Sequence, residues 1–241
     1  MKNKRILALI TFFTGMPFAV YGMHIAEGFL PPLWALFYYV VCIPFVFIGL
    51  KKVRQLSKEN SDIKMLLGLV AAYCLLLSAL KLPSLTGSSS HLTGTSIGTI
   101  IFGPMVMSVV AIVVLIFQAL FLAHGGITTL GANTLSMGIV GPLVTFAVYQ
   151  IFKKKNKQLG MFLGALLGNF ATYAVTALQL ATVFQGGSFM ATLGKFLSVF
   201  AITQVPLGIV EGIFTILLFN YLHKNSNDTV GKMMGGYAYE K

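Results

Sequence analysis

Residues 95–123 read TSIGTIIFGPMVMSVVAIVVLIFQALFLA, a run that contains no charged side chain. The run is longer than the ~20 residues that one helix needs to cross a bilayer, and Gly103-Pro104 interrupts it. Glycine and proline break helices, so this run predicts two short helices that turn near Gly103. At about 1.5 Å per residue each half is too short to cross about 30 Å of hydrocarbon, so the pair requires shielding by protein or a locally thinned bilayer.

The composition places the whole chain in the membrane class. Of 241 residues, 56% are hydrophobic and only 10% are charged, and the mean hydropathy is +0.85. These values predict a polytopic membrane protein. We find no internal repeat or low-complexity block, so we expect one all-α helical bundle in residues 23–222. Its other apolar segments lie at 31–50, 64–82, 133–152, 159–184 and 195–222.

Two basic loops decide the number of crossings. The loops 51–64 and 153–157 are rich in lysine and arginine, which is typical of cytoplasmic loops. A single crossing at 95–123 would put them on opposite faces of the membrane, whereas a double crossing puts both in the cytoplasm. We therefore expect about seven transmembrane segments, an external N-terminus and a cytoplasmic tail at 223–241. The net charge of +11 then reflects topology, and no nucleic-acid partner is expected.

Residues 1–22 have the three parts of a secretory signal peptide. Lys2, Lys4 and Arg5 form a basic start, an apolar stretch follows from Ile6, and Val20-Tyr21-Gly22 supplies a cleavage position. Cleavage after Gly22 would leave Met23 as the mature N-terminus. The alternative is an uncleaved first membrane helix, which would remove the free amine from residue 23.

The string Met23-His24-Ile25 matters because a histidine at mature position two can chelate a metal ion through three nitrogens. These are the amine of Met23 and the amide and imidazole nitrogens of His24. The uncharged loop 83–99 resembles irregular backbone that lines a protein cavity, and it offers His91 as a fourth nitrogen. Copper, nickel and cobalt suit such a nitrogen-rich square site, whereas calcium and magnesium prefer oxygen.

Four further residues are predicted to surround and support these ligands. They are Glu27, Ser90, His124 and Asn133. Metal-bound imidazoles need orienting partners, and we expect His124 to serve in this way before acting as a ligand. Two alternatives stay open, because Glu27 could cap a turn and the glycines after His124 could only turn the chain.

Glu211 stands out because it lies inside the apolar segment 195–222. A charge at such a position is costly and is usually paired or functional. No basic residue lies near it in the segment, so its partner must come from elsewhere in the bundle. A proton relay and a structural hydrogen bond are both compatible with this position.

Small and apolar residues predict internal packing. Gly160, Gly164 and Gly168 recur every four residues and would allow another helix to approach closely, most simply a helix of this same bundle. Cys42 and Cys74 both lie in apolar stretches, where a cysteine behaves as a core residue rather than as a metal ligand.

Three strings resemble the CbiM family of cobalt-transport membrane proteins, to which the nickel-specific NikM proteins are related. They are MHIAEGFLPP (23–32), GSSSHLTGTSIGTIIFGP (87–104) and AHGGITTLGANTLSMGIVGP (123–142). The resemblance implies the substrate-binding component of an energy-coupling factor importer, which takes up Co(II) for cobalamin biosynthesis, with Ni(II) as the alternative. It implies three kinds of partner: a transmembrane coupling protein, cytoplasmic ATPase subunits and a small accessory membrane protein.

The resemblance also implies the ligand set: the amine of Met23, the backbone and side chain of His24, and the ring of His91. This sequence departs from the family pattern at Leu92, where proline is frequent, and at Ser96, where glycine is frequent. Both departures affect the rigidity of the loop rather than the identity of the ligands.

Energy for uptake must come from a partner, because the chain has no GxxxxGK[ST] phosphate-binding loop and thus no ATP site of its own. We do not expect an enzyme. An intramembrane hydrolase could pair one of Ser88, Ser89 or Ser90 with a histidine, but the serine and its base would be adjacent in sequence and no GxSxG string is present. A passive channel would need a ring of repeated ligands, which one nonrepeating chain does not supply.

Overall fold

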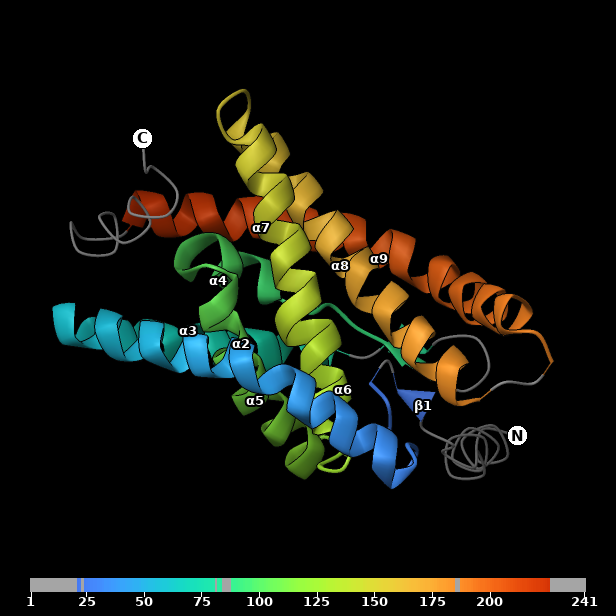
Figure 1. Ribbon diagram of the computed structural model, residues 1–241. Helices are drawn as coiled ribbons and strands as arrows, with labels where there is room; N and C mark the ends of the chain where they lie inside the picture. The colour runs from blue at the N-terminus through green and yellow to red at the C-terminus, as the bar shows by residue number, and fades with distance from the viewer. Residues whose placement is uncertain (1–20, 23, 81, 84–87, 185–186, 226–241) are drawn as a thin grey trace, which may run out of the picture.

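The computed structural model describes residues 21–22, 24–80, 82–83, 88–184 and 187–225. The predicted signal peptide up to residue 20, Met23 and the tail from residue 226 lie outside the described residues. The helices are α2 (Pro32–Glu59), α3 (Asp62–Ala79), α4 (Thr95–Phe102), α5 (Pro104–Phe121), α6 (Leu130–Asn133), the π-helix η2 (Thr134–Val140), α7 (Gly141–Phe152), α8 (Lys157–Val183) and α9 (Phe189–Asn225). This arrangement confirms the all-α membrane bundle (Figure 1).

Six of the described helical segments are long and apolar enough to cross a membrane. Helices α6, η2 and α7 run on as one segment, Leu130–Phe152, and the others are α2, α3, α5, α8 and α9. The seven predicted segments are therefore present as six helices of spanning length together with the short α4.

The predicted break at Gly103 separates α4 from α5. Gly103 has a φ of +84°, which glycine tolerates, and Pro104 begins α5, where its missing N–H costs nothing. All eight residues of α4 are buried, so protein shields this short helix as expected. The expectation that both halves are short was wrong for α5, whose 18 residues extend for about 27 Å.

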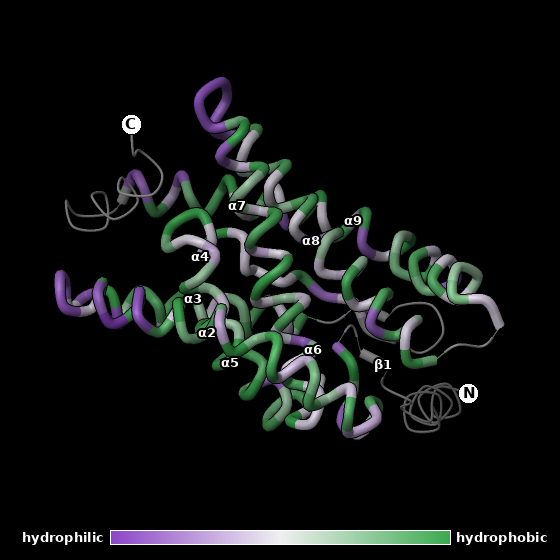
Figure 2. The backbone as a smooth tube through the Cα atoms, viewed as in Figure 1, coloured by the Kyte–Doolittle hydropathy of each residue, from purple (hydrophilic) through white to green (hydrophobic). Residues whose placement is uncertain are grey.

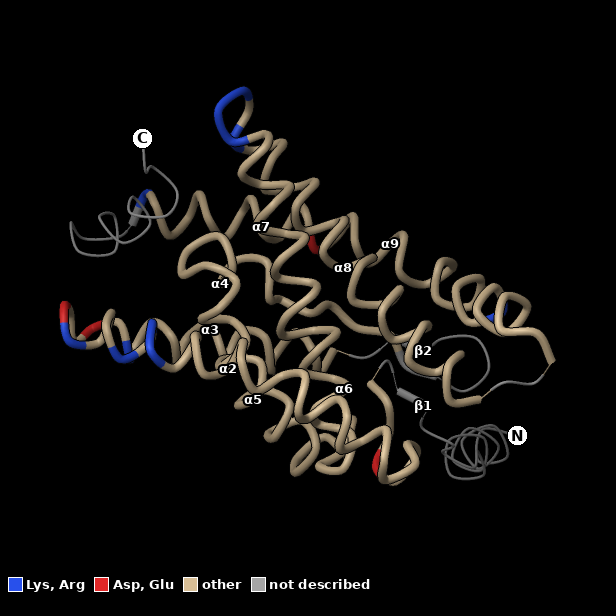
Figure 3. The backbone as a smooth tube through the Cα atoms, viewed as in Figure 1, with Lys and Arg blue, Asp and Glu red and all other residues tan. Residues whose placement is uncertain are grey.

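The two basic loops lie on one side of the bundle. Figure 3 shows Lys and Arg gathered at the turn between α2 and α3 and at the turn between α7 and α8, while β1 (Tyr21–Gly22) lies on the opposite side. Figure 2 shows that these turns are also hydrophilic and that apolar residues predominate between them and the β1 side. The assignment of these turns to the cytoplasmic side stays a prediction.

The apolar core surrounds α4, which packs against α3, α5, α7 and α8. Cys74 of α3, Ile97 and Ile100 of α4, and Met107 of α5 belong to one buried apolar cluster. Cys42 is buried as well, so both cysteines occupy the interior as predicted. The outer faces of the long helices carry exposed apolar side chains, such as Leu36 and Ile43 of α2. An apolar exterior around an apolar core is what a bilayer requires as solvent.

Three short strands form a small sheet beside the start of α4, in the order β1, β3 (Ser88–Ser90) and β2 (Leu82–Pro83). β3 pairs in antiparallel fashion with β2 and in parallel with β1. The register sets Tyr21 opposite Ser88 and Gly22 opposite Ser89. The chain just before His24 therefore runs beside the chain just before His91.

The glycines of α8 face α7 rather than an external partner. A Cβ atom at Gly164 would lie 2.9 Å from the backbone oxygen of Thr145, and one at Gly168 would overlap the Thr145 hydroxyl. Gly160 faces the end of α7 in the same way, near Phe152. The small residues thus let α7 and α8 pack closely within this bundle.

We predict that Gly164→Leu destabilises the protein by about 3 kcal/mol, because a large side chain must push α7 away from α8. Thermal unfolding in detergent micelles measures the change. Gly68→Leu on α3 is the matched control, because a Cβ there meets nothing within 4 Å and the expected change is within about 0.5 kcal/mol. Equal stability of the two variants would show that α7 and α8 do not pack through this face.

Candidate metal centre

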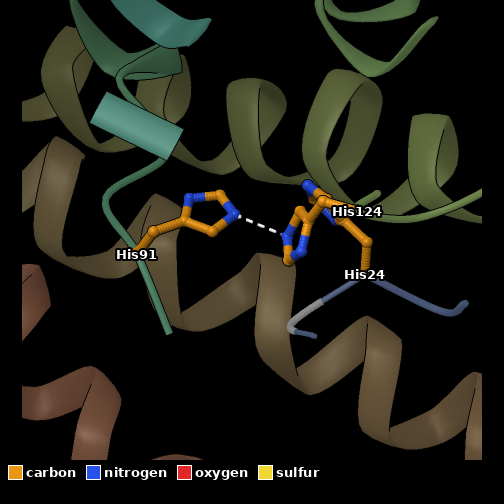
Figure 4. Close-up of side chains that lie close together, drawn as sticks. All are labelled: His24, His91 and His124. Carbon is orange, nitrogen blue, oxygen red and sulfur yellow. Dashed lines mark hydrogen bonds between the residues drawn. The ribbon is translucent and has the colours of Figure 1, made fainter. Parts of the chain in front are cut away.

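Three histidines from distant parts of the sequence meet inside the bundle. His24 precedes α2, His91 follows β3, and His124 follows α5. Their exposed fractions are 2%, 0% and 1%, respectively. One ring nitrogen from each lies within 4.8 Å of the others. Figure 4 shows the three rings converging, with His91 directed at His124 and His24 beside them.

The orientation of His91 leaves a lone pair for the centre of this cluster. Its Nδ1–H donates to the backbone oxygen of Leu92 at 2.7 Å, and a carbonyl can only accept. In the neutral ring Nε2 is then the basic nitrogen, and it lies 2.9 Å from Nε2 of His124. Two neighbouring ligands at right angles around a metal lie about 2.8 Å apart when each bond is about 2 Å, so this spacing suits a shared ion.

The backbone beside His24 is fixed by the segment that follows His124. Asn133 accepts a hydrogen bond from the Ile25 N–H at 2.9 Å and donates one to the Ile25 carbonyl at 3.1 Å. Thr129 donates its hydroxyl to the same carbonyl at 2.6 Å. The side chain of Asn133 therefore forms hydrogen bonds with both the N–H and the carbonyl of Ile25, as the backbone of a neighbouring strand would.

Glu27 ties the same two segments together at a second point. Its carboxylate accepts a hydrogen bond from the backbone N–H of Thr128 at 3.1–3.2 Å, and the Thr128 hydroxyl accepts one from the N–H of Gly28 at 2.9 Å. Glu27 therefore bonds to the backbone of the segment after His124, and this contact holds the N-terminal string against that segment.

The glycines after His124 turn the chain and make room for the N-terminal string. Gly125 has a φ of +74°, and a Cβ atom there would lie 3.4 Å from that of His24. A Cβ at Gly126 would lie 2.5 Å from the Cα of Glu27, closer than folded chains allow. Gly125 thus turns the chain, whereas Gly126 provides more than a turn, because the N-terminal string needs the space of its missing side chain.

The segment that carries His91 is held by residues of α8 and α9. Ser90 donates its hydroxyl to that of Thr203 on α9 at 3.0 Å, so Ser90 is directed at α9 and not at the histidines. Thr93 bonds to Glu211 of α9 through its backbone N–H at 2.9 Å and through its hydroxyl at 2.5 Å. The hydroxyl of Tyr173 on α8 donates to the His91 carbonyl at 3.4 Å.

Sequence reasoning anticipated part of this arrangement. His24 and His91 lie together as expected, while Met23 lies outside the described residues. His124 was expected to support the ligands, and its ring lies inside the cluster. Thr93 and Thr129 were missed, although each belongs to an uncharged run of hydroxyl and glycine residues next to a histidine.

Comparisons with known proteins agree with one another. The family model CbiM, described as a cobalt uptake substrate-specific transmembrane region, matches residues 24–229. A protein of Clostridium tetani named cobalt transport protein CbiM is 55% identical over 219 residues, which are 90% of each chain. A protein of the same name from Thermosipho melanesiensis is 49% identical and covers 95% of this chain and 97% of its own.

Solved structures share the fold. A truncated transition metal transporter superposes with a TM-score of 0.74 at 26% identity, covering 85% of this chain and all of its own. A second structure, described as a transition metal transporter, gives a TM-score of 0.75 over 90% of this chain at 23% identity, a level that speaks for the fold alone.

We predict that Asn133→Ala costs about 1–3 kcal/mol of stability, because it leaves a buried backbone N–H of Ile25 without its acceptor. It should also raise the hydrogen-exchange rate of residues 24–30. Ser136→Ala is the matched control, since among the described residues this buried hydroxyl bonds to the Asn133 carbonyl one turn earlier and to no other segment. Exchange in residues 24–30 that is equally slow in both variants would contradict the assigned role of Asn133.

Proposed function

This chain belongs to the CbiM family of cobalt uptake substrate-specific transmembrane regions, and from that premise we propose that it captures Co(II) at the centre formed by His24, His91 and His124. The protein is a multi-pass membrane component of metal transport, and its family is not a family of enzymes. The observation that carries the proposal is the convergence of three buried imidazoles within 4.8 Å in an apolar bundle.

The proposed ligands are nitrogen atoms. The amine of a mature Met23 terminus, the amide and ring of His24, and Nε2 of His91 make a four-nitrogen square. His124 lies beside His91 with the two Nε2 atoms 2.9 Å apart, so its ring can face the same ion as a further nitrogen next to this square. The burial of all three rings supports tight binding, because a metal site inside protein excludes competing water.

Cobalt is the proposed substrate, with nickel as the alternative. Both ions suit nitrogen ligands, and the Irving–Williams order favours nickel at a given site. The family and the named relatives point to cobalt, and we therefore propose Co(II) uptake that serves cobalamin biosynthesis.

The direction and the energy of transport follow from the topology. We propose that the face with the basic turns is cytoplasmic and that the face with His24 is external, in accordance with the positive-inside rule. The chain has no phosphate-binding loop, so an energy-coupling factor assembly supplies the energy. Its parts are a transmembrane coupling protein, ATPase subunits and a small accessory membrane protein.

The hydrolase alternative gains no support from the site. Ser90 donates to Thr203 on α9, and the His91 ring bonds to Leu92 and His124, so the two side chains do not form a nucleophile–base pair. The side chains of Ser88 and Ser89 lie outside the described residues. We therefore propose no hydrolytic reaction for this chain.

Metal titration of the purified protein tests the proposal. We expect His24→Ala and His91→Ala each to weaken Co(II) and Ni(II) binding at least about 100-fold, because each removes a ligand, and His124→Ala to weaken it about 10- to 100-fold. The measurement is isothermal calorimetry or a competition titration with a chelating dye.

His223→Ala is the control, because His223 lies at the end of α9, where its ring stacks near Phe219. Its affinity for both metals should equal that of the wild type. A His24→Ala variant that binds as tightly as the wild type would overturn the proposed site.

A further inference from the structure

Glu211 is fully buried in α9, and the partners that the structure gives its carboxylate are all uncharged donors. One oxygen accepts the hydroxyls of Thr93 and Ser96, at 2.5 and 3.1 Å. The other accepts the backbone N–H of Thr93 at 2.9 Å and the side-chain amide of Asn169 at 3.1 Å. Burying an acidic side chain in an apolar bundle costs free energy, so an acid held by four hydrogen bonds indicates a structural or functional role.

One partner of Glu211 lies close to His91 in the chain. Thr93 follows His91 by two residues and is bonded to Glu211, while Ser90 precedes His91 by one residue and is bonded to Thr203. Thr203 and Glu211 are both on α9. The backbone that carries His91 is thus attached to the same helix on both sides of the histidine.

The other two histidines are attached to different helices. The string after His24 is bonded to Asn133 at the end of α6, and the N–H of His124 donates to the carbonyl of Gln118 on α5 at 3.2 Å. Helix α9 packs chiefly against α8 and also contacts α4. His91 is therefore attached to α9 and, through the Tyr173 hydroxyl, to α8, whereas His24 and His124 are attached to α6 and α5.

We propose that Glu211 is a positioning residue that makes the place of His91 in the metal centre depend on α9. The inference rests on the proposed function, since it assigns a role at that same site. A shift of α9 relative to α5 and α6 would carry Thr93 and Ser90 with it and withdraw the His91 ring from His24 and His124. Such a shift provides a route by which movement of one peripheral helix weakens metal binding.

The hydrogen bonds of Glu211 allow the effect of its shape to be separated from the effect of its charge. The hydroxyls of Thr93 and Ser96 can rotate and accept instead of donate. A glutamine at position 211 can therefore place its NH₂ toward them and keep its oxygen toward the Thr93 N–H. Glu211→Gln should keep His91 in place, whereas Glu211→Ala removes the attachment.

The test is Co(II) and Ni(II) titration with absorption spectra of the bound metals, using folded protein selected by size-exclusion chromatography. We expect Glu211→Ala to weaken binding about 10- to 100-fold and to shift the d–d bands toward those of His91→Ala. Glu211→Gln should restore both to within a few-fold of the wild type. In the His91→Ala background, Glu211→Ala should add nothing, because it acts through His91.

Thr215→Val is the matched control, since this buried hydroxyl on α9 has one partner within the described part of the chain, the backbone oxygen of Glu211 at 2.7 Å. It should bind metal with wild-type affinity and spectrum. If Glu211→Ala does not fold, Thr93→Val provides the test, because it removes the hydroxyl that donates to Glu211 next to His91. A wild-type spectrum and affinity in that variant would overturn the proposal.

The remaining outcomes are distinct. A folded Glu211→Ala protein with wild-type binding, or one that loses affinity equally with and without His91, would overturn the positioning role and leave the proposed function standing. Wild-type protein that binds neither metal would overturn both.

Discussion

Inside an apolar bundle, every backbone N–H and C=O needs a hydrogen bond, because an unsatisfied group costs several kcal/mol. The segments that carry the histidines are not helical and cannot meet this need by themselves. Three side chains meet it instead: Asn133 bonds to the N–H of Ile25, Glu211 to that of Thr93, and Glu27 to that of Thr128. The geometry of the centre depends on these three acceptors.

This constraint explains why irregular backbone and buried polar side chains occur together. Each acceptor joins two segments that are far apart in sequence, so meeting the backbone requirement also brings the histidines together. Gly126 permits the closest approach, because any side chain there would overlap Glu27. The same hydrogen bonds therefore pack the loops and position the histidines, so a change in the loop packing also changes the metal centre.

The sequence allowed prediction of the parts that depend on local pattern. Apolar runs located the long helices, and Gly103-Pro104 located the break between α4 and α5. The side assignments brought His24 and His91 to one face. What could not be predicted depends on contacts between distant positions: Glu211 finds its donors 42 to 118 residues away. The place of His124 in the cluster and the full span of α5 likewise come from packing, which local composition does not encode.

The proposed metal centre requires that a mature N-terminus folds into the bundle and binds a metal ion with the histidines. Native mass spectrometry of the protein, purified from membranes of cells grown with Co(II), tests this claim most directly, because one spectrum gives both the start of the chain and the bound ion. We expect a chain that begins at Met23 and carries one divalent metal ion. A metal-bound chain that begins at Met1, or a Met23 chain that retains no metal, would contradict it.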